Sequence, residues 1–364
     1  MMTSTPLRAR LAEFGSRGVL ASISELDRLE AGCHELARLA YDADELGVFL
    51  SVVATAGLAL PLLARGGAAH GALHAAGLRG EAVLAVGITE RGAGSDVRAM
   101  TTALRRAPNG ALRLDGRKWH ITNAPEADAA IVFAMDKTTS DTFLVAVVVR
   151  REDRGVSFGP PLELVGCKGS PTGEILLDGV EVPEDRVLGR REDGQKWLDL
   201  AFTRERVLAP WPLVGKMERV IEECLDHVET RVQFDRPLHE FQFVQDKILT
   251  AYSALVNARS LADAALRAVV SGGNVAVSAS LAKAAAADAA VEVFRAAIEV
   301  FGSYGVQASA RYGAYLADAL CAQIAGGTRE THKKIVFGEL RLDRARARRG
   351  RRSELFRWSN GEPS

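Results

Sequence analysis

The sequence contains few cysteines and no excess of charge of either sign. Its 364 residues include four cysteines, and Lys+Arg and Asp+Glu are equal at 46 each. A disulfide-rich secreted fold is disfavoured because it needs many cysteines, and nucleic-acid binding is disfavoured because it needs a basic surplus. The cysteines also lack metal-ligand spacing, so they predict reduced thiols in a cytoplasmic protein. These residues are Cys33, Cys167, Cys224 and Cys321.

Long hydrophobic runs are scarce as well. The first fifteen residues have no apolar core of the kind found in a secretion signal. Residues 46–64 form an uncharged stretch about long enough to span a bilayer. Ser51, Thr55, Gly57 and Pro61 interrupt this stretch and lower its hydrophobicity. A buried helix is therefore favoured over a membrane span.

Three zones of different texture follow one another along the chain. Residues 1–81 are rich in Ala and Leu, which indicates helices. Residues 82–190 contain short β-branched runs separated by Gly, Pro and Asp-Gly, which is typical of strands. Helical periodicity returns over residues 191–345, and a basic tail occupies residues 346–364. The order predicts an α+β protein in which a β domain lies between two helical domains.

Local signals refine this division. The pair Asp115-Gly116 stands between two strand-like runs and predicts a hairpin turn. In the C-terminal zone, apolar residues recur at helical spacing over residues 214–228. The Ala-rich residues 279–297 predict a helix that packs closely on several sides. Pro210 and Pro212 predict a kink in the helix that contains them.

The chain ends in a cluster of positive charge. Residues 341–352 contain seven arginines and one aspartate, on a chain that is otherwise neutral. A solvated chain end is the favoured interpretation, and a docking patch for an acidic partner is the alternative.

Two short segments carry the clearest chemical signal. Residues 87–96, GITERGAGSD, form a glycine-rich loop with hydroxyl groups, which can offer backbone N–H groups to an anion or to the edge of a flavin. The segment is not a GxGxxG followed by a helix, so a nicotinamide-binding Rossmann fold is not indicated. Residues 118–123, KWHITN, end another strand-like run about 25 residues later. Taken singly, the first segment would be interpreted as a tight turn and the second as a half-buried edge strand.

Together, the two segments resemble the paired flavin-binding motifs of the acyl-CoA dehydrogenase family, TEPGAGSD and KxWITN. Downstream, residues 231–242, RVQFDRPLHEFQ, resemble that family's RxxFGxPL…Q segment, and residues 301–305, FGSYG, resemble its FGGxG. Asp318-Ala319 and Gly327-Thr328 stand at its RDA and EGT positions. The resemblance is in register from about residue 40 to residue 340.

The resemblance implies an N-terminal helical domain, a central β domain and a C-terminal four-helix bundle. FAD would lie between the β domain and the bundle, and a neighbouring subunit of a homodimer or homotetramer would complete its adenosine end. The implied reaction is FAD-dependent α,β-dehydrogenation of an acyl thioester on CoA or on an acyl carrier protein. Electrons would pass to an electron-transfer flavoprotein or another acceptor.

The motifs also imply roles for individual residues. Thr89 would bond the pyrimidine edge of the flavin, Thr122 would donate toward flavin N5, and His120 would take the place of the usual aromatic residue beside the ring. Ser95 would contact the pyrophosphate and lie near the thioester. Arg231 would pair with the pyrophosphate of the partner's FAD. The other cofactor-binding residues implied are Phe234, Gln242, Gly302 and Thr328.

The catalytic base is displaced in this sequence. Most family members place a Glu immediately before Gly-Thr, but here that position is Gly326, which cannot accept a proton. Isovaleryl- and long-chain acyl-CoA dehydrogenases instead use a Glu that precedes an Arg in an earlier helix. Glu205-Arg206 occupies that place, 26 residues before Arg231. The resemblance therefore implies Glu205 as the α-proton base and Arg206 as a substrate-binding residue.

Other departures keep two alternatives open. The N-terminal domain is some tens of residues short, and the usual residues are replaced by Arg91, Asp235, Glu299 and Ser303. A flavin-dependent oxygenase on the same fold is one alternative, and it would not need Glu205. A catalytically silent flavin-binding subunit is the other, and the glycine at the usual base position supports it.

Overall fold

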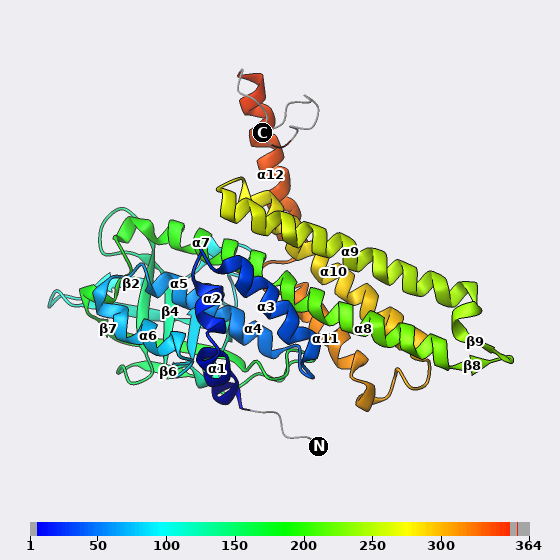
Figure 1. Ribbon diagram of the computed structural model, residues 1–364. Helices are drawn as coiled ribbons and strands as arrows, with labels where there is room; N and C mark the ends of the chain where they lie inside the picture. The colour runs from blue at the N-terminus through cyan, green and yellow to red at the C-terminus, as the bar shows by residue number, and fades with distance from the viewer. Residues whose placement is uncertain (1–5, 350–354, 356–364) are drawn as a thin grey trace.

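The computed structural model describes residues 6–349 and residue 355. A sheet-containing part and a set of long helices lie end to end, and the N-terminal helices cover the sheet and reach toward the long helices (Figure 1). The remaining residues, among them 350–354 and 356–364 of the predicted basic tail, lie outside the described part of the chain.

The N-terminal part is helical, as predicted. Its helices are α1 (Leu7–Ser16), α2 (Val19–Ser24), α3 (Leu29–Asp42), α4 (Val48–Val52), a π-helix η1 (Val53–Ala59), α5 (Leu60–Leu63), η2 (Ala68–His70) and α6 (Gly71–Leu78). The uncharged stretch 46–64 forms α4, η1 and α5 and is almost wholly buried. The prediction of a buried helix is confirmed, and none of the described helices is long and apolar enough to cross a membrane.

A seven-stranded mixed sheet forms the central part. Its strand order is β1-β4-β2-β3-β7-β6, and β5 pairs with β4. The β1–β4 pairing is parallel, while β3 pairs antiparallel with β2 and β7. The strands are β1 (Leu84–Gly87), β2 (Ala103–Arg106), β3 (Leu112–Thr122), β4 (Ala129–Asp136), β5 (Phe143–Arg150), β6 (Val156–Phe158) and β7 (Thr172–Val182). Short 3-10 helices lie between strands at η3 (Val97–Ala99) and η4 (Ala124–Glu126), and two more, η5 (Glu184–Arg186) and η6 (Arg191–Asp193), lead from β7 to the next helix.

The predicted hairpin at Asp115-Gly116 is wrong. Strand β3 continues through this pair, and its register against β7 shifts between Leu114 and Gly116, which marks a β-bulge. Gly116 has φ +151°, and a Cβ at this position would lie 2.6 Å from the Cα of Thr102. The turn lies instead at residues 107–110, where the Gly110 N–H donates to the Ala107 carbonyl. A bulge and a turn both favour glycine, so the Asp-Gly pair did not distinguish them.

The C-terminal part is a bundle of long helices. Ala209 alone separates two of them, because the first helix ends at Leu208 and the next begins at Pro210. Ala209 itself keeps a helical backbone, so the helical path is interrupted for one residue at the prolines, where the sequence predicts a kink. Buried alanines of the predicted segment 279–297 face several neighbouring helices at once. The elements are α7 (Gly194–Leu208), α8 (Pro210–Thr230), β8 (Val232–Gln233), β9 (Arg236–Pro237), η7 (Leu238–Glu240), α9 (Gln242–Ser271), α10 (Val275–Phe301), η8 (Ala308–Ala310), α11 (Tyr312–Ala322) and α12 (Arg329–Arg348).

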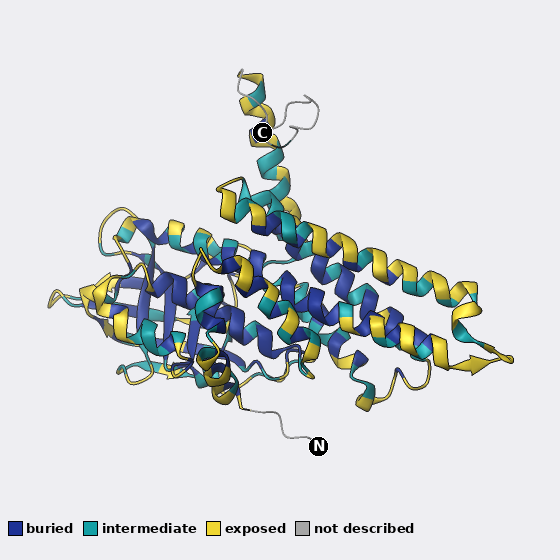
Figure 2. Cartoon of the chain, in the orientation of Figure 1, coloured by how far each residue is buried: buried dark blue, intermediate teal, exposed yellow. Residues whose placement is uncertain are grey.

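Burial follows this arrangement. Buried residues fill the sheet and the inner helix faces, whereas the outer side of α9 and the β8–β9 hairpin are exposed (Figure 2). The end of α7, which carries Glu205, and the start of α12 lie near the junction of the sheet and the bundle, so the fold gathers their residues there (Figure 1).

Candidate active site

A buried ion pair joins the two loop segments that the sequence singled out. The Lys118 ammonium donates to Glu90 at 2.9 Å and to the Ile88 carbonyl at 3.0 Å, and Lys118 is fully buried. Burial raises the pKa of Glu90, but hydrogen bonds from Thr102, Thr101 and Lys118 outweigh it and lower the pKa to about 2. The pair therefore fixes the GITERGAGSD loop against the strand that carries KWHITN.

The end of β3 is shaped by a second bulge. The Trp119 N–H donates to the Thr89 carbonyl at 2.9 Å, which places the predicted residue Thr89 beside β3. His120 has φ +56° and an exposed side chain, and Thr122 is the last residue of the strand. Asn123, fully buried, donates to the Leu84 carbonyl at 2.8 Å and locks this end to β1. Thr89, His120 and Thr122 are thus brought to one end of the sheet.

One departure from the family pattern has a local explanation. The Arg91 guanidinium lies 3.6 Å from the centre of the Trp119 ring, a distance at which a cation–π interaction forms. Arg91 also reaches Glu174 at 3.4 Å. Its side chain therefore covers the tryptophan beside His120, where proline would leave the ring open.

The glycine-rich loop meets the start of α12. The Thr331 hydroxyl lies 3.4 Å from the Ser95 hydroxyl, and the Thr331 N–H donates to the Thr328 side chain, which caps the helix. Ser95 is exposed, and a Cβ at Gly92 or Gly94 would meet nothing within 4 Å. The contact between Ser95 and Thr331 therefore brings the glycine-rich loop beside Thr328, the residue that caps α12.

Glu205 occupies the space that the side chain of residue 326 would need. A Cβ placed on Gly326 would overlap the carboxyl carbon and both carboxylate oxygens of Glu205. Gly326 has φ +67°, a conformation that glycine adopts without strain. The carboxylates of the two sequence positions, one on α7 and one in the loop before α12, would thus enter the same volume.

The Glu205 carboxylate is buried without a direct hydrogen bond to one of its oxygens. Oε2 has no partner among the described residues, and the side chain is almost inaccessible. Burial raises the pKa of Glu205, while the nearby charges of Lys283 and Arg206 act in the opposite direction. An unpaired buried carboxylate with a raised pKa is suited to accept a proton.

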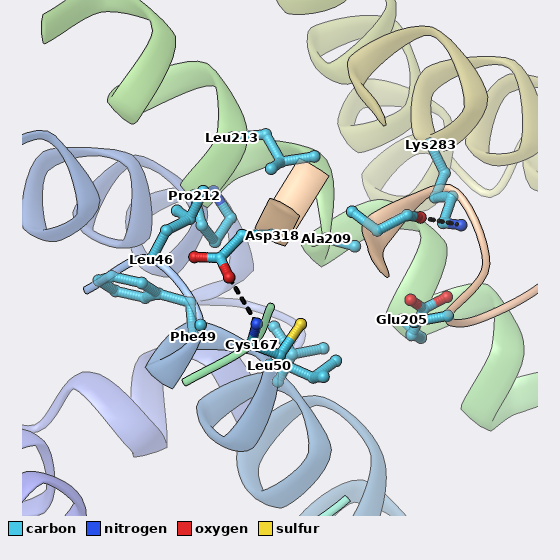
Figure 3. Close-up of a pocket in the computed structure, with 14 residues that line it drawn as sticks. Leu46, Phe49, Leu50, Cys167, Glu205, Ala209, Pro212, Leu213, Lys283 and Asp318 are labelled. Atoms are coloured by element: carbon cyan, nitrogen blue, oxygen red, sulfur yellow. Dashed lines mark hydrogen bonds between the residues drawn. The ribbon is translucent and has the colours of Figure 1, made fainter. Parts of the chain in front are cut away.

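Lys283 connects this carboxylate to the loop that contains Gly326. Its ammonium donates to the Ala322 carbonyl at 2.7 Å and to the Gly327 carbonyl at 2.9 Å, and it is almost wholly buried (Figure 3). Burial lowers the pKa of Lys283, and Glu205 opposes that shift. Lys283 therefore holds the loop and sets a positive charge near Glu205.

Two further side chains near Glu205 have buried nitrogen atoms without a hydrogen-bond partner among the described residues. His332 is 1% exposed, and both of its ring nitrogens lack partners within the described residues. Burial lowers the pKa of His332 to about 4, so the ring is neutral at pH 7. Burial also lowers the pKa of Arg206, whose Nε has no partner in the same described set.

A cavity of about 70 Å³ extends from Glu205 between α4, α8 and α11. Figure 3 shows Glu205 and Lys283 at one side of this cavity, and Leu46 and Phe49 at the other. Its walls are mostly apolar. The lining residues are Leu46, Gly47, Phe49, Leu50, Val53, Cys167, Glu205, Ala209, Pro212, Leu213, Lys283, Asp318, Ala322 and Ala325.

The remaining predicted cofactor residues lie at the far end of the bundle. Arg231 lines a separate hollow of about 510 Å³ together with Phe301 and Tyr304. Phe234 is 89% exposed on the β8–β9 connection, which Figure 1 shows at the end opposite the sheet. The 21 residues of α8 separate the two ends by about 30 Å. One chain therefore does not bring Arg231, Phe234, Gln242 and Gly302 to the residues around Glu205.

The other departures fall near this far end. Asp235 keeps a left-handed backbone, with φ +60°, which aspartate tolerates better than most residues do. Glu299 forms ion pairs with Lys247 and Arg295. Nothing in the structure explains Ser303.

Sequence reasoning missed several residues of the site. Lys118 and Glu90 stood inside the two motifs, but their pairing needed the fold to be seen. Lys283 is a lysine within an Ala-rich helical stretch, a pattern that could have indicated a buried charge. His332 and the cavity walls gave no signal, because neither follows a motif.

The chain is similar in sequence and in fold to known proteins. Residues 85–180 match the profile described as acyl-CoA dehydrogenase, middle domain, and residues 192–340 match acyl-CoA dehydrogenase, C-terminal domain. A 3-(aryl)acrylate reductase of Clostridium sporogenes is 31% identical over 72% of this chain and 70% of its own length. Isovaleryl-CoA dehydrogenase, mitochondrial, of Solanum tuberosum is 34% identical over 72% of this chain, and the match spans 64% of that protein.

Two other similar proteins bear on the substrate. L-prolyl-[peptidyl-carrier protein] dehydrogenase of Pseudomonas fluorescens is 30% identical over 72% of this chain and 70% of its own length. Among solved structures, butyryl-CoA dehydrogenase from Megasphaera elsdenii superimposes with a TM-score of 0.83 at 26% identity, covering 91% of this chain and 89% of that one.

Proposed function

The chain belongs to the acyl-CoA dehydrogenase family, and on that premise we propose that it removes one hydrogen each from the α and β carbons of an acyl thioester, with Glu205 as the α-proton base. The observation that carries this proposal is the position of the Glu205 carboxylate. It is buried, and it fills the volume of the missing side chain at Gly326. A carboxylate is thus retained where the family needs one, although it comes from a different helix.

The residues at the junction fit FAD, the cofactor of this family. The Ser95 side chain is exposed beside the start of α12, and glycines at 92 and 94 leave room for close approach of a phosphate to the loop backbone. We assign Thr89 and Thr122 to the flavin ring, with His120 beside it. FAD, when bound, supplies the acceptor for the hydride from the β carbon.

The chemistry of this chain's own residues follows from their surroundings. Glu205 takes the α proton, because its raised pKa makes it a stronger base than an exposed carboxylate. The positive charges of Lys283 and Arg206 oppose this rise in the pKa and so favour the ionised carboxylate. The apolar cavity walls exclude water from the carboxylate and receive the acyl group.

We propose that a second copy of the chain completes each site. Arg231 and the hollow beside it lie about 30 Å from Glu205 along α8, which is farther than one FAD reaches, so they serve the FAD of a partner. Large exposed apolar side chains on the hairpin, α9 and α12 support such an interface. They include Phe234, Phe243, Leu249, Tyr252 and Phe337. The proposed assembly is a homodimer or a homotetramer.

The carrier of the thioester and the electron acceptor complete the proposal. CoA and an acyl carrier protein present the same phosphopantetheine arm, and related proteins of both kinds are known. An electron-transfer flavoprotein or another acceptor would reoxidise the flavin. The four cysteines are free in the described part of the chain, and the cytoplasmic location stays a proposal.

Anaerobic reduction of the flavin tests the proposal directly. Acyl thioesters added to the FAD-bound enzyme should bleach its visible absorbance, and Glu205→Gln should keep FAD but lose bleaching by about 10²–10⁴-fold in rate. An oxygenase would keep its activity without this carboxylate, and a silent subunit would show no bleaching in the wild type. Either result would replace the dehydrogenase proposal.

A further inference from the structure

The cavity beside Glu205 is small and nearly all of its wall is hydrocarbon. Its volume is about 70 Å³, which holds roughly five or six water-sized positions. Phe49 and Leu46 stand opposite Glu205 and limit how far a chain can extend (Figure 3). Phe49 is supported from behind by Phe14, whose ring is stacked on it at 6.3 Å. The far wall is therefore backed by packed side chains.

Apart from Glu205, the charged groups that line the cavity are bonded within the protein itself. Asp318 accepts the Cys167 N–H at 2.5 Å and the Gly47 N–H, so its carboxylate serves to join α11 to two loops. Lys283 is bonded to two carbonyl oxygens. Neither group is aimed at a ligand as a free donor or acceptor.

The same groups oppose charged acyl chains. An acyl group with a cationic nitrogen near its α carbon would lose its negative partner as Glu205 takes the α proton, and it would then lie beside Lys283 and Arg206, both positive. An acyl group that ends in a second carboxylate would bring it to Asp318 at the far side. Burying such charges without a partner costs several kcal/mol.

We infer that the thioester carries a short, uncharged hydrocarbon acyl group of roughly four to six carbons, straight or branched, and not an aminoacyl, dicarboxylic or long-chain group. This inference rests on the proposed function, because it assigns the cavity to the acyl group of that reaction. Each buried methylene improves binding, by about fourfold, until the chain meets Phe49.

A chain-length profile of anaerobic bleaching tests this inference with the FAD-bound enzyme. The thioesters are propionyl-, butyryl-, isovaleryl-, hexanoyl-, octanoyl-, dodecanoyl-, glutaryl- and prolyl-CoA. The apparent second-order rate constant for flavin reduction should peak between butyryl- and hexanoyl-CoA and fall by roughly tenfold or more at octanoyl-CoA. Glutaryl- and prolyl-CoA should be about a hundredfold poorer than butyryl-CoA.

Two opposite changes at one position give the sharper test. Phe49→Ala should move the peak to longer chains, with octanoyl gaining about tenfold relative to butyryl, and Phe49→Trp should move it to shorter chains. Phe133→Ala is the matched control, because Phe133 is equally buried but lies outside the cavity. It should lower the melting temperature and leave the profile unchanged.

The outcomes separate this inference from the proposed function. A best rate with dodecanoyl-, glutaryl- or prolyl-CoA would overturn the inference and leave the dehydrogenase intact. Profiles that do not move in either Phe49 variant would also overturn it, since the acyl group would then lie elsewhere. Absence of bleaching by every thioester would overturn the proposed function and the inference together.

Discussion

Moving the catalytic carboxylate from α7 to residue 326 is the most informative perturbation of this site. In the wild type, Gly326→Glu places a Cβ within the Glu205 carboxylate and a side chain on a backbone of φ +67°. The left-handed conformation alone costs about 1–2 kcal/mol for a residue other than glycine. Overlap with Glu205 adds the cost of overpacking, about 1–3 kcal/mol. Gly326→Glu should therefore destabilise the protein by several kcal/mol.

The second change decides whether the new carboxylate can work. Glu205→Gln keeps a side chain of the same shape, so it leaves the volume filled and Gly326→Glu should fail in that background. Glu205→Ala empties the volume. In Glu205→Ala alone, bleaching should fall by about 10²–10⁴-fold, because the base is lost. Gly326→Glu in the Glu205→Ala background should recover roughly one to two of these powers of ten, since the carboxylate enters the same space.

Anaerobic stopped-flow reduction with butyryl-CoA, together with thermal unfolding of each variant, is the assay. FAD content serves as the control for folding. The reasoning is refuted if Gly326→Glu alone keeps wild-type stability and rate, because the overlap would then be absent. It is refuted as well if the Glu205→Ala, Gly326→Glu protein binds FAD, is folded and reacts no faster than Glu205→Ala.

Four other expectations follow from the contacts. Lys283→Met removes a positive charge that lowers the pKa of Glu205, so the acid limb of the pH profile for bleaching should move to higher pH. Lys283→Arg should move this limb less. An acid limb that stays in place in both variants would contradict the role of Lys283. Folding lowers the pKa of Glu90 from 4.5 to about 2, so the stability from its pairing is present above pH 4.5 and is lost as the pH falls toward 2. The loss in the free energy of unfolding is about 3 kcal/mol. In Glu90→Gln, the free energy of unfolding should therefore depend less on pH over that window. Arg231→Ala should weaken FAD retention by about 10–100-fold. Mixed assemblies of Arg231→Ala with Glu205→Gln chains should regain activity, because half of their sites then contain both Glu205 and Arg231. No regain of activity would mean that Arg231 serves its own chain. Deleting the residues after Leu340 removes the arginine cluster and should slow an acidic carrier-bound substrate more than a CoA substrate at low salt; equal effects on both would exclude docking there.

Motifs made the ends of the site predictable, and packing made its centre unpredictable. The segments GITERGAGSD and KWHITN each end a strand that the sequence also predicts, and the structure brings Thr89, His120 and Thr122 to one end of the sheet. The shared volume of Glu205 and Gly326 is different. It depends on how α7 meets the loop before α12, 121 residues later, and no local pattern encodes that contact.

Glycine was the least reliable guide. Asp115-Gly116 was predicted as a turn and forms a bulge within β3, since both structures ask for the same residue. Lys283 shows the complementary case: its role comes from two backbone carbonyls that lie 39 and 44 residues away in sequence. Such a partner can be seen only after the bundle is assembled.

The central claim is that Glu205 is the base for α-proton removal, and the most direct measurement is the anaerobic bleaching rate of FAD-bound Glu205→Gln with butyryl-CoA beside the wild type. The account predicts full FAD content, a normal melting temperature and a rate lower by about 10²–10⁴-fold. A wild-type rate in Glu205→Gln would contradict it.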